Sequence, residues 1–238
     1  MELIGLHGFR QDGRHCDELR KINCKLGVLP QADGSAVFEV GNTKVMAAVY
    51  GPHEPSSVLR HKVPHDRALL NCVFSMATFS TTERKKRPTG DKRSQSFSIN
   101  LKQAFDSVVL THLYPRSQID LYVQVTQSDG ANYAACINAA TLAFIDACIP
   151  MKDYVSACTA SIVDEKGVLD VSYLEESQGC PVLTLALLPR SEEIVVTDMN
   201  ARLHLDHLPN MLDFAMKGCK DIFSVMESAT RAHVNSKS

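Results

Sequence analysis

Residues 117–150 read SQIDLYVQVTQSDGANYAACINAATLAFIDACIP, and this stretch is the most informative about the fold class. Apolar and polar residues alternate over residues 119–125, which is typical of a strand with one buried face. Gly130 begins a turn, and a helix of small residues follows to about Cys148, where Pro150 stops it. The stretch therefore predicts a half-buried strand that turns into a largely apolar helix.

The flanking sequence adds strands in blocks with helices between them. Residues 36–40 and 43–50 flank Gly41-Asn42, a pair typical of a hairpin turn. The remaining segments are read from periodicity alone. The predicted strands are 68–77, 155–163, 181–188 and 194–198, and the predicted helices are 94–113 and 208–231. This order favours a two-layer α+β domain over a doubly wound parallel sheet.

Composition excludes several classes of protein. The chain has 238 residues, of which 45% are hydrophobic, and a formal net charge of −2. These values exclude a disordered or coiled-coil chain and argue against a generally basic nucleic-acid binder. The positive charge is instead concentrated in residues 83–93, ERKKRPTGDKR, with six basic residues against two acidic ones.

The cysteines and the apolar segments bear on the compartment. None of the eight cysteines forms a C-x-x-C pair, and several stand among small apolar residues, as expected of reduced, buried thiols. The N-terminus has no basic flank or long apolar core, so it does not read as a secretory signal. Residues 134–151 are too polar and too short to span a membrane. These features predict a soluble protein of the cytoplasm, the nucleus or both.

The basic segment has two readings that the residues alone leave open. It is either a solvated charge run or a loop whose cations neutralise successive phosphates, with Arg60 and Lys62 of the preceding polar loop joining it. Phe79 and Phe97 flank the segment but fit core positions better, so base stacking is predicted to be poor. RNA binding would then be led by the backbone and weakly specific for sequence.

Other groups of residues give less specific evidence for a functional site. The turn at Gly130 is either an anion site at a helix N-terminus or a simple connection. Asp170 and Glu176, six residues apart, are of the type that holds a divalent metal or supplies a general acid. The pair His61 and His65 and the cluster at 204–207 are interpreted as surface histidines. The chain contains neither G-x-G-x-x-G nor G-x-x-x-x-G-K-[ST], the two glycine-rich motifs of nucleotide-binding folds.

Several short stretches occur together in one known family. They are RQDGR at 10–14, QADGSA at 31–36, GNTK at 41–44, YGP at 50–52, DRA at 66–68, ATFS at 77–80, ERK at 83–85, PRSQID at 115–120 and DACIPM at 146–151. In this order the chain resembles the RNase PH family of phosphorolytic ribonucleases. Within that family it is most similar to the exosome ring subunit that carries the phosphorolytic site in archaea.

The resemblance implies a fold and a set of partners. The fold would be the two-layer α+β RNase PH fold, like ribosomal protein S5 domain 2, as a single domain over residues 1–238 with a core of about 10–232. The subunit would sit in a six-membered ring of RNase PH-like subunits, with RNA-binding cap subunits, single-stranded RNA and associated hydrolytic nucleases, and no membrane. It would act in the nucleus, including the nucleolus, and in the cytoplasm.

The family's functional positions map onto this chain with two departures. The phosphate-site positions are Arg93, Gly130, Ala131, Asn132 and Tyr133, and the acidic positions are Asp170 and Glu176. The RNA-binding positions are Arg60, Lys62, Arg84, Lys85, Lys86, Arg87, Lys92 and Arg93. Tyr133 stands where active members have arginine, and Glu176 where they have aspartate. Tyrosine supplies no positive charge, and glutamate is one methylene longer.

These departures predict a catalytically inactive ring subunit that threads single-stranded RNA to 3′–5′ exoribonucleases for RNA processing and decay. On this reading Asp170 and Glu176 are vestigial, and no cofactor or metal is expected. The alternative is an active phosphate-dependent 3′–5′ exoribonuclease that uses Mg²⁺ and inorganic phosphate and releases nucleoside diphosphates. A stand-alone enzyme acting on small molecules ranks last, because the chain has no other set of motifs.

Overall fold

The computed structural model describes residues 4–5, 8–55, 63–84, 90–163 and 166–237. A five-stranded sheet is built from β1 (Ile22–Leu26), β2 (Gly34–Val40), β3 (Thr43–His53), β4 (Leu69–Met76) and β5 (Gln118–Gln127). The strand order is β1-β2-β3-β5-β4, and only the pairing of β4 with β5 is parallel. The hairpin expected at Gly41-Asn42 is confirmed, because Val40 pairs with Thr43 across it.

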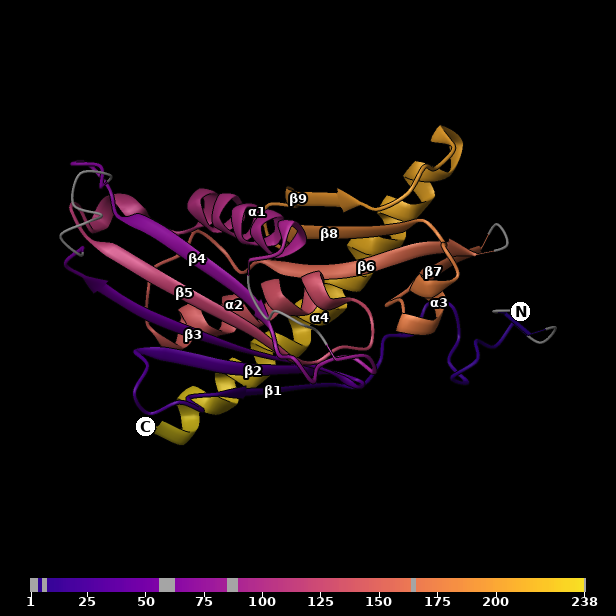
Figure 1. Ribbon diagram of the computed structural model, residues 1–238, viewed down its shortest axis with the longest axis horizontal. Helices are drawn as coiled ribbons and strands as arrows, with labels where there is room; N and C mark the ends of the chain where they lie inside the picture. The colour runs from indigo at the N-terminus through magenta and orange to yellow at the C-terminus, as the bar shows by residue number, and fades with distance from the viewer. Residues whose placement is uncertain (1–3, 6–7, 56–62, 85–89, 164–165, 238) are drawn as a thin grey trace.

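A second sheet follows in the chain, and Figure 1 shows it lying beside the first. It contains β6 (Ser156–Val163), β7 (Lys166–Leu169), β8 (Val182–Leu188) and β9 (Glu193–Met199), in the order β7-β6-β8-β9. All its pairings are antiparallel. The alternation of two mainly antiparallel sheets with helices confirms the α+β fold class.

Three long helices pack on these sheets. They are α1 (Lys92–Val108), α2 (Asn132–Asp146) and α4 (Leu208–Lys237), and a short helix, α3 (Tyr173–Ser177), follows β7. The central helix α2 contacts β2, β3 and β5 of the first sheet and β6 and β8 of the second. Because it is covered on every side, its residues from Tyr133 to Phe144 are all buried, which explains its uniformly small and apolar sequence.

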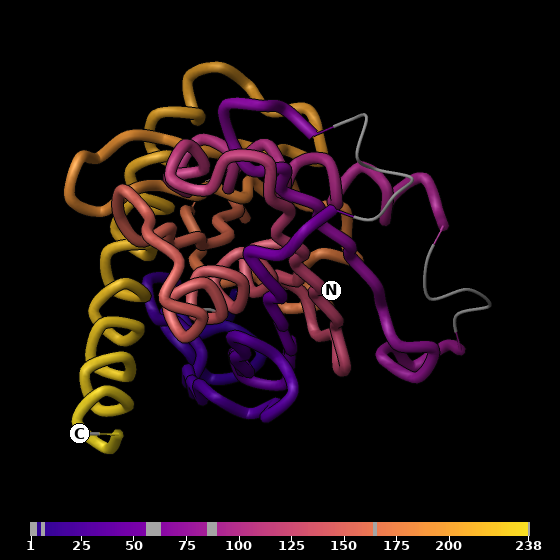
Figure 2. Tube along the Cα trace, turned by 90° about the vertical axis from the view of Figure 1, so that its left-hand side faces the viewer, coloured from indigo at the N-terminus to yellow at the C-terminus, as the bar shows by residue number. Residues whose placement is uncertain are grey.

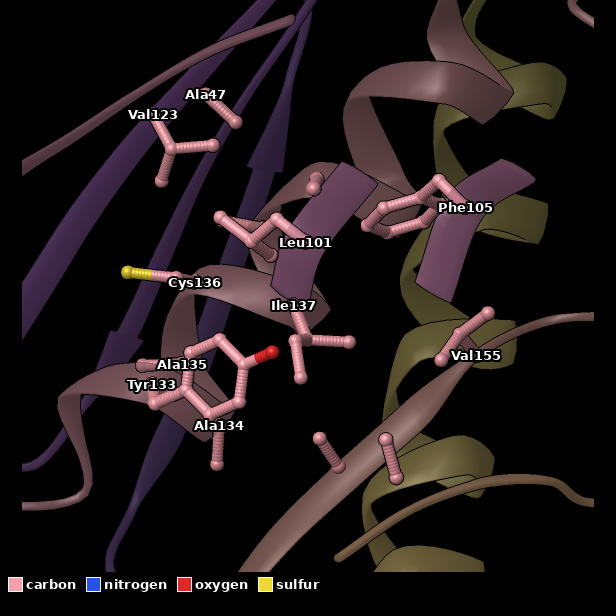
Figure 3. Packing of buried hydrophobic residues seen from close by; sticks show 14 of the residues in the cluster. Ala47, Leu101, Phe105, Val123, Tyr133, Ala134, Ala135, Cys136, Ile137 and Val155 are labelled. Atoms are coloured by element: carbon pink, nitrogen blue, oxygen red, sulfur yellow. The ribbon is translucent and has the colours of Figure 1, made fainter. Parts of the chain in front are cut away.

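The longest helix, α4, spans much of the molecule. It packs on β6, β7 and β8 and also reaches β1, and Figure 1 shows it running diagonally behind both sheets. Figure 2 shows it as a straight yellow helix along one side of the molecule, ending at the C-terminus. One hydrophobic cluster contains residues of both sheets and of α1, α2 and α4. Figure 3 shows part of it, with Leu101 and Phe105 of α1 facing Ile137 of α2.

Several boundaries differ from the sequence-based expectations. The helix predicted over 94–113 ends at Val108, because Val109 adopts extended angles, and a 3₁₀ turn, Thr111–Leu113, follows. The predictions do not include β1, β7 or α3, which are only four or five residues long and depend on tertiary pairing. The last helix extends beyond residue 231 to Lys237.

Side-chain burial corrects two further expectations. Phe79 is 75% exposed, so placing it in the core is wrong, whereas Phe97 packs against the core cluster. Cys72, Cys136, Cys158 and Cys219 are buried as expected, but Cys148 is exposed. His65 and His204 are exposed, and His61 lies outside the described residues. Within the described residues, no helix is long and apolar enough to cross a membrane.

Candidate RNA 3′-end site

A cleft of about 560 Å³ lies where α1, α3, β8 and β9 meet the turn before α2. Its described charged side chains are two cations and four carboxylates: Arg84, Arg93, Glu83, Asp91, Glu176 and Asp198. A second hollow continues from it past Lys92 and Gly179. The cleft therefore brings together residues from the basic segment, the Gly130 turn and the second sheet, which lie far apart in the sequence.

Arg93 lies in the first turn of α1, at the wall of the cleft. Its guanidinium Nη2 is 3.6 Å from Oε1 of Glu176, and its Cζ lies 5.6 Å from the centre of the Phe97 ring. A cation over an aromatic face is attracted by the ring's negative face. The Arg93 side chain is still 70% exposed, so it is free to bind an anion that enters the cleft.

The turn before α2 has the backbone that the sequence suggested. Ala131, the N-cap, is in the left-handed region with φ 53°, and Gly130 has φ 80°. A Cβ on Gly130 would lie 2.5 Å from the carbonyl oxygen of Val171, so only glycine fits. Ala131, Asn132 and Tyr133 line the cleft, and Oδ1 of Asn132 is buried without a hydrogen-bond partner in the described structure.

Tyr133 lies at the boundary between the cleft and the core. Its ring stacks on Phe97 with the ring centres 5.0 Å apart and the planes 9° apart. Only 4% of the residue is exposed, and its hydroxyl has no hydrogen-bond partner among the described residues. Burial raises the pKa of this hydroxyl well above its ordinary value, so Tyr133 stays neutral. Tyr133 thus supports Phe97, which in turn lies under Arg93.

The two carboxylates of the expected pair are separated by the fold. Glu176 lines the cleft, but Asp170 does not. Asp170 is 4% exposed, and its carboxylate accepts hydrogen bonds from the backbone N–H of Arg20, at 2.9 Å, and from the Arg20 guanidinium, at 2.7 and 2.8 Å. Arg14 lies 3.5 Å away on the same carboxylate. Asp170 is therefore an anchor for residues 14–20.

This arrangement does not fit a metal held jointly by Asp170 and Glu176. The oxygens of Asp170 are occupied by guanidinium and amide donors, which would have to leave before a cation could bind. The described part of the chain also contains no group of three His, Cys, Asp or Glu side chains placed to hold a metal ion. Glu176 keeps a partly exposed carboxylate in the cleft, beside the Arg93 guanidinium.

Comparison with known proteins identifies the family. Residues 18–150 match the family model described as "3′ exoribonuclease family, domain 1", and residues 153–218 match "3′ exoribonuclease family, domain 2". The chain belongs to the RNase PH family. The expected resemblance is thereby confirmed over most of the chain.

Named members of the RNase PH family match this chain over nearly its whole length. The human "Exosome complex component RRP41" is 52% identical over 238 residues, covering 100% of this chain and 97% of the relative. The "Exosome complex component Rrp41" of Methanopyrus kandleri is 40% identical over 229 residues, covering 96% and 95% of the two chains.

Solved structures of RNase PH relatives show the same fold. Rice Rrp46 superposes with a TM-score of 0.83 at 23% identity, covering 93% of this chain and 100% of the other. The Archaeoglobus fulgidus exosome with RNA bound to the active site gives a TM-score of 0.78 at 21% identity, covering 92% of each chain.

These comparisons correct one expectation. The prediction that this RNase PH chain is catalytically inactive is contradicted. The family is described as exoribonucleases, and the Rrp41 relative from Methanopyrus kandleri is 40% identical over 96% of this chain. The physical reason is that the predicted inactivity depends on only two side chains. Glu176 still places a carboxylate beside Arg93, and Gly130 and Ala131 form the turn that precedes α2, with φ values of 80° and 53°.

Only some of the site residues predicted from the sequence are shown to lie at the cleft. Arg84, Arg93 and Glu176 line the cleft, and Lys92 lines its continuation. The positions Arg60, Lys62, Lys85, Lys86 and Arg87 lie outside the described residues, so their RNA-binding role stays a prediction. Tyr173, Asp198 and Asn200 line the cleft but are not among the predicted residues. No local spacing marks these three, because the pairing of the second sheet and the packing of α3 bring them there.

Proposed function

We propose that this chain is an exosome ring subunit whose cleft binds the 3′ end of single-stranded RNA. The observation that carries the proposal is the placement of Arg93. Its exposed guanidinium faces a cleft that is also lined by Ala131 and Asn132 of the turn before α2. The 52% identity over the whole chain to proteins named exosome complex component RRP41 supports the assignment to the ring.

The partners and the compartment follow from the same proposal. The chain would assemble with other RNase PH-like subunits in a six-membered ring and associate with RNA-binding cap subunits and hydrolytic nucleases. It would contribute to RNA processing, including that of ribosomal RNA, and to RNA degradation in the nucleus, nucleolus and cytoplasm. Copurification of a tagged full-length chain with RNase PH-like subunits tests the ring assignment, and recovery of the chain alone would contradict it.

RNA binding at Arg93 has a specific signature. We expect Arg93→Gln to weaken binding of a fluorescent single-stranded RNA about 10- to 150-fold, because a charge-assisted bond contributes about 1.5–3 kcal/mol. The slope of log K against log salt should also fall by about 0.7 for each phosphate that the variant no longer neutralises. Arg231→Gln, on the exposed face of α4, is the matched control and should leave both quantities unchanged. Equal effects of the two substitutions would contradict a site at Arg93.

A second candidate is phosphate-dependent cleavage at the same cleft. It is favoured by the family description and by the Glu176 carboxylate, which lies beside the Arg93 guanidinium. An oxygen of inorganic phosphate would attack the phosphorus of the terminal phosphodiester, and the bond from that phosphorus to the 3′ oxygen of the shortened RNA would break. The 3′ oxygen would leave and take up a proton, and the terminal nucleotide would be released as a nucleoside diphosphate. Arg93 would orient phosphate groups, while Glu176 is placed to exchange a proton.

The assembled ring, given RNA, inorganic phosphate and Mg²⁺, tests this candidate by release of nucleoside diphosphate. We expect release that requires phosphate and falls when Glu176 is changed to Gln. The same ring without phosphate is the control. Absence of phosphate-dependent release would overturn the enzymatic candidate and leave RNA binding standing.

A further inference from the structure

The short helix α3 presents two large exposed apolar side chains. Tyr173 is 49% exposed and Leu174 is 57% exposed. Of the two, only Tyr173 lines the cleft. An aromatic ring half in water, on the wall of a polar cleft, leaves apolar surface that a flat ligand could cover.

Three contacts fix the backbone around Tyr173. The backbone N–H of Ser172 donates a hydrogen bond to Oε2 of Glu175 at 2.8 Å, closing the first turn of α3. The buried Arg10 donates from Nε to Oε1 of the same Glu175 at 2.7 Å. Gly130 packs so closely that its Cβ would lie 2.7 Å from the backbone nitrogen of Tyr173. The ring therefore has little backbone freedom to lose when a ligand binds.

The Tyr173 side chain is connected to Arg93, a cation of the cleft, through Glu176. Glu176 follows Tyr173 by three positions on α3, a spacing that makes side chains neighbours on one helix face. Glu176 in turn lies 3.6 Å from the guanidinium of Arg93. An aromatic face and a phosphate-binding cation thus stand on adjoining parts of one wall, an arrangement that suits a base and a phosphate of the same RNA strand.

We propose that Tyr173 is a stacking platform for the base of one nucleotide near the 3′ end of a single-stranded RNA. The proposal rests on the proposed RNA-binding function and adds a subsite to it. Bases of every kind have a flat π face, so such a platform would strengthen binding without selecting a sequence. The charged groups of the cleft would hold the backbone, and Tyr173 would hold the base.

Equilibrium binding of the full-length chain to a 5′-fluorescent oligoadenylate of ten nucleotides tests the proposal. We expect Tyr173→Leu to weaken binding about 5- to 150-fold, as for the loss of one stacked base. Tyr173→Phe keeps the ring and should bind within about twofold of the wild type on the same reasoning. Leu174→Ala removes the neighbouring exposed side chain outside the cleft and should have no effect.

A scan with abasic RNA separates stacking from a general disturbance of the cleft. Four further oligonucleotides each lack one base among the last four positions. At one of these positions the abasic RNA should bind wild type as weakly as intact RNA binds Tyr173→Leu, with no further loss when both changes are combined. Additive losses at all four positions would overturn the platform, even if Tyr173→Leu weakens binding.

Two other outcomes would also overturn the proposal. Wild-type affinity of Tyr173→Leu for intact RNA, with weaker assembly into the ring, would mean that a neighbouring subunit covers the tyrosine. In that case Arg93→Gln would still weaken RNA binding, and the proposed function would stand. Failure of the wild-type chain to bind the oligoadenylate at all would instead overturn RNA binding and the platform together.

Discussion

At the scale of single residues, Tyr133, which stands at a position predicted to bind phosphate, has a structural role. Tyr133 stacks on the Phe97 ring, and the guanidinium of Arg93 also lies against that ring. An arginine-to-tyrosine difference suggests a lost charge when the sequence is read alone. In the folded chain Tyr133 is part of the core, and α1 supplies Arg93, one of the two cations of the cleft.

The buried hydroxyl of Tyr133 leads to a stability prediction. We expect Tyr133→Phe to leave the free energy of unfolding unchanged or raise it by up to about 1–3 kcal/mol, because an unpartnered buried hydroxyl is costly. Tyr133→Leu should lower it, because the stacked ring pair is lost. Urea unfolding followed by circular dichroism measures both. Tyr122→Phe, on an exposed ring, is the control, and a clear loss of stability in Tyr133→Phe would contradict the expectation.

At the scale of elements, one carboxylate joins the ends of two helices to a strand. Asp146 ends α2 and accepts hydrogen bonds from the backbone N–H of Ser35 in β2, at 3.0 Å, and from Nζ of Lys237 in α4, at 3.1 Å. The Nε2 atom of His233 lies 3.1 Å away. Burial alone would raise the pKa of Asp146, but these partners outweigh it and lower the pKa below its usual 3.8.

The lowered pKa of Asp146 determines how the stability of the fold changes with pH. A carboxyl group with a depressed folded-state pKa stabilises the fold above its unfolded pKa, and this stability is lost as the pH falls through the folded value. Asp146→Asn should therefore cost about 1.5–3 kcal/mol at neutral pH, and less as the pH falls below 3.8. Urea unfolding across this range measures it, with Asp213→Asn, an exposed position on α4, as control. A cost independent of pH would contradict the role of the charge.

At the scale of the whole molecule, the two sheets share one core. Two domain models of the family match the chain, and the boundary between them lies near residue 150. In the structure, however, α2 lies against both sheets, and the main hydrophobic cluster contains residues from both sides of this boundary. The surface of α2 is covered by both sheets, so neither sheet alone would bury the whole helix. The description of residues 1–238 as a single domain, with a core of about 10–232, stays a prediction that unfolding can test.

We expect one cooperative unfolding transition for the full-length chain. Tyrosine fluorescence and far-ultraviolet circular dichroism should give coincident urea curves with a single midpoint, since loss of either sheet exposes α2. A fragment of residues 1–152 should lack the cooperative transition, because α2 would lose β6 and β8. Two separated transitions would show that the halves are independent domains.

Local sequence was enough to predict the fold class, the long elements and several site residues. Alternation at 119–125, the Gly41-Asn42 turn and the apolar run before Pro150 are local signals, because they depend on side-chain period and backbone freedom. The turn at Gly130 could be selected from its glycine, whereas Arg93 was selected through the resemblance to the RNase PH family, and their roles in binding stay predictions. The short strands β1 and β7 could not, since strands of this length form only against a partner.

Which residues meet was settled by tertiary packing alone. Packing buried Asp170 in a bidentate pair with Arg20, whereas Glu176 lines the cleft. A buried carboxylate needs such partners, and Arg20 is distant in the sequence. Packing also brought Tyr173 and Asp198 to the cleft and placed Phe79 in solvent. Such choices depend on burial and on contacts between distant segments, and these are set when the two sheets close around α2, not by the spacing of residues along the chain.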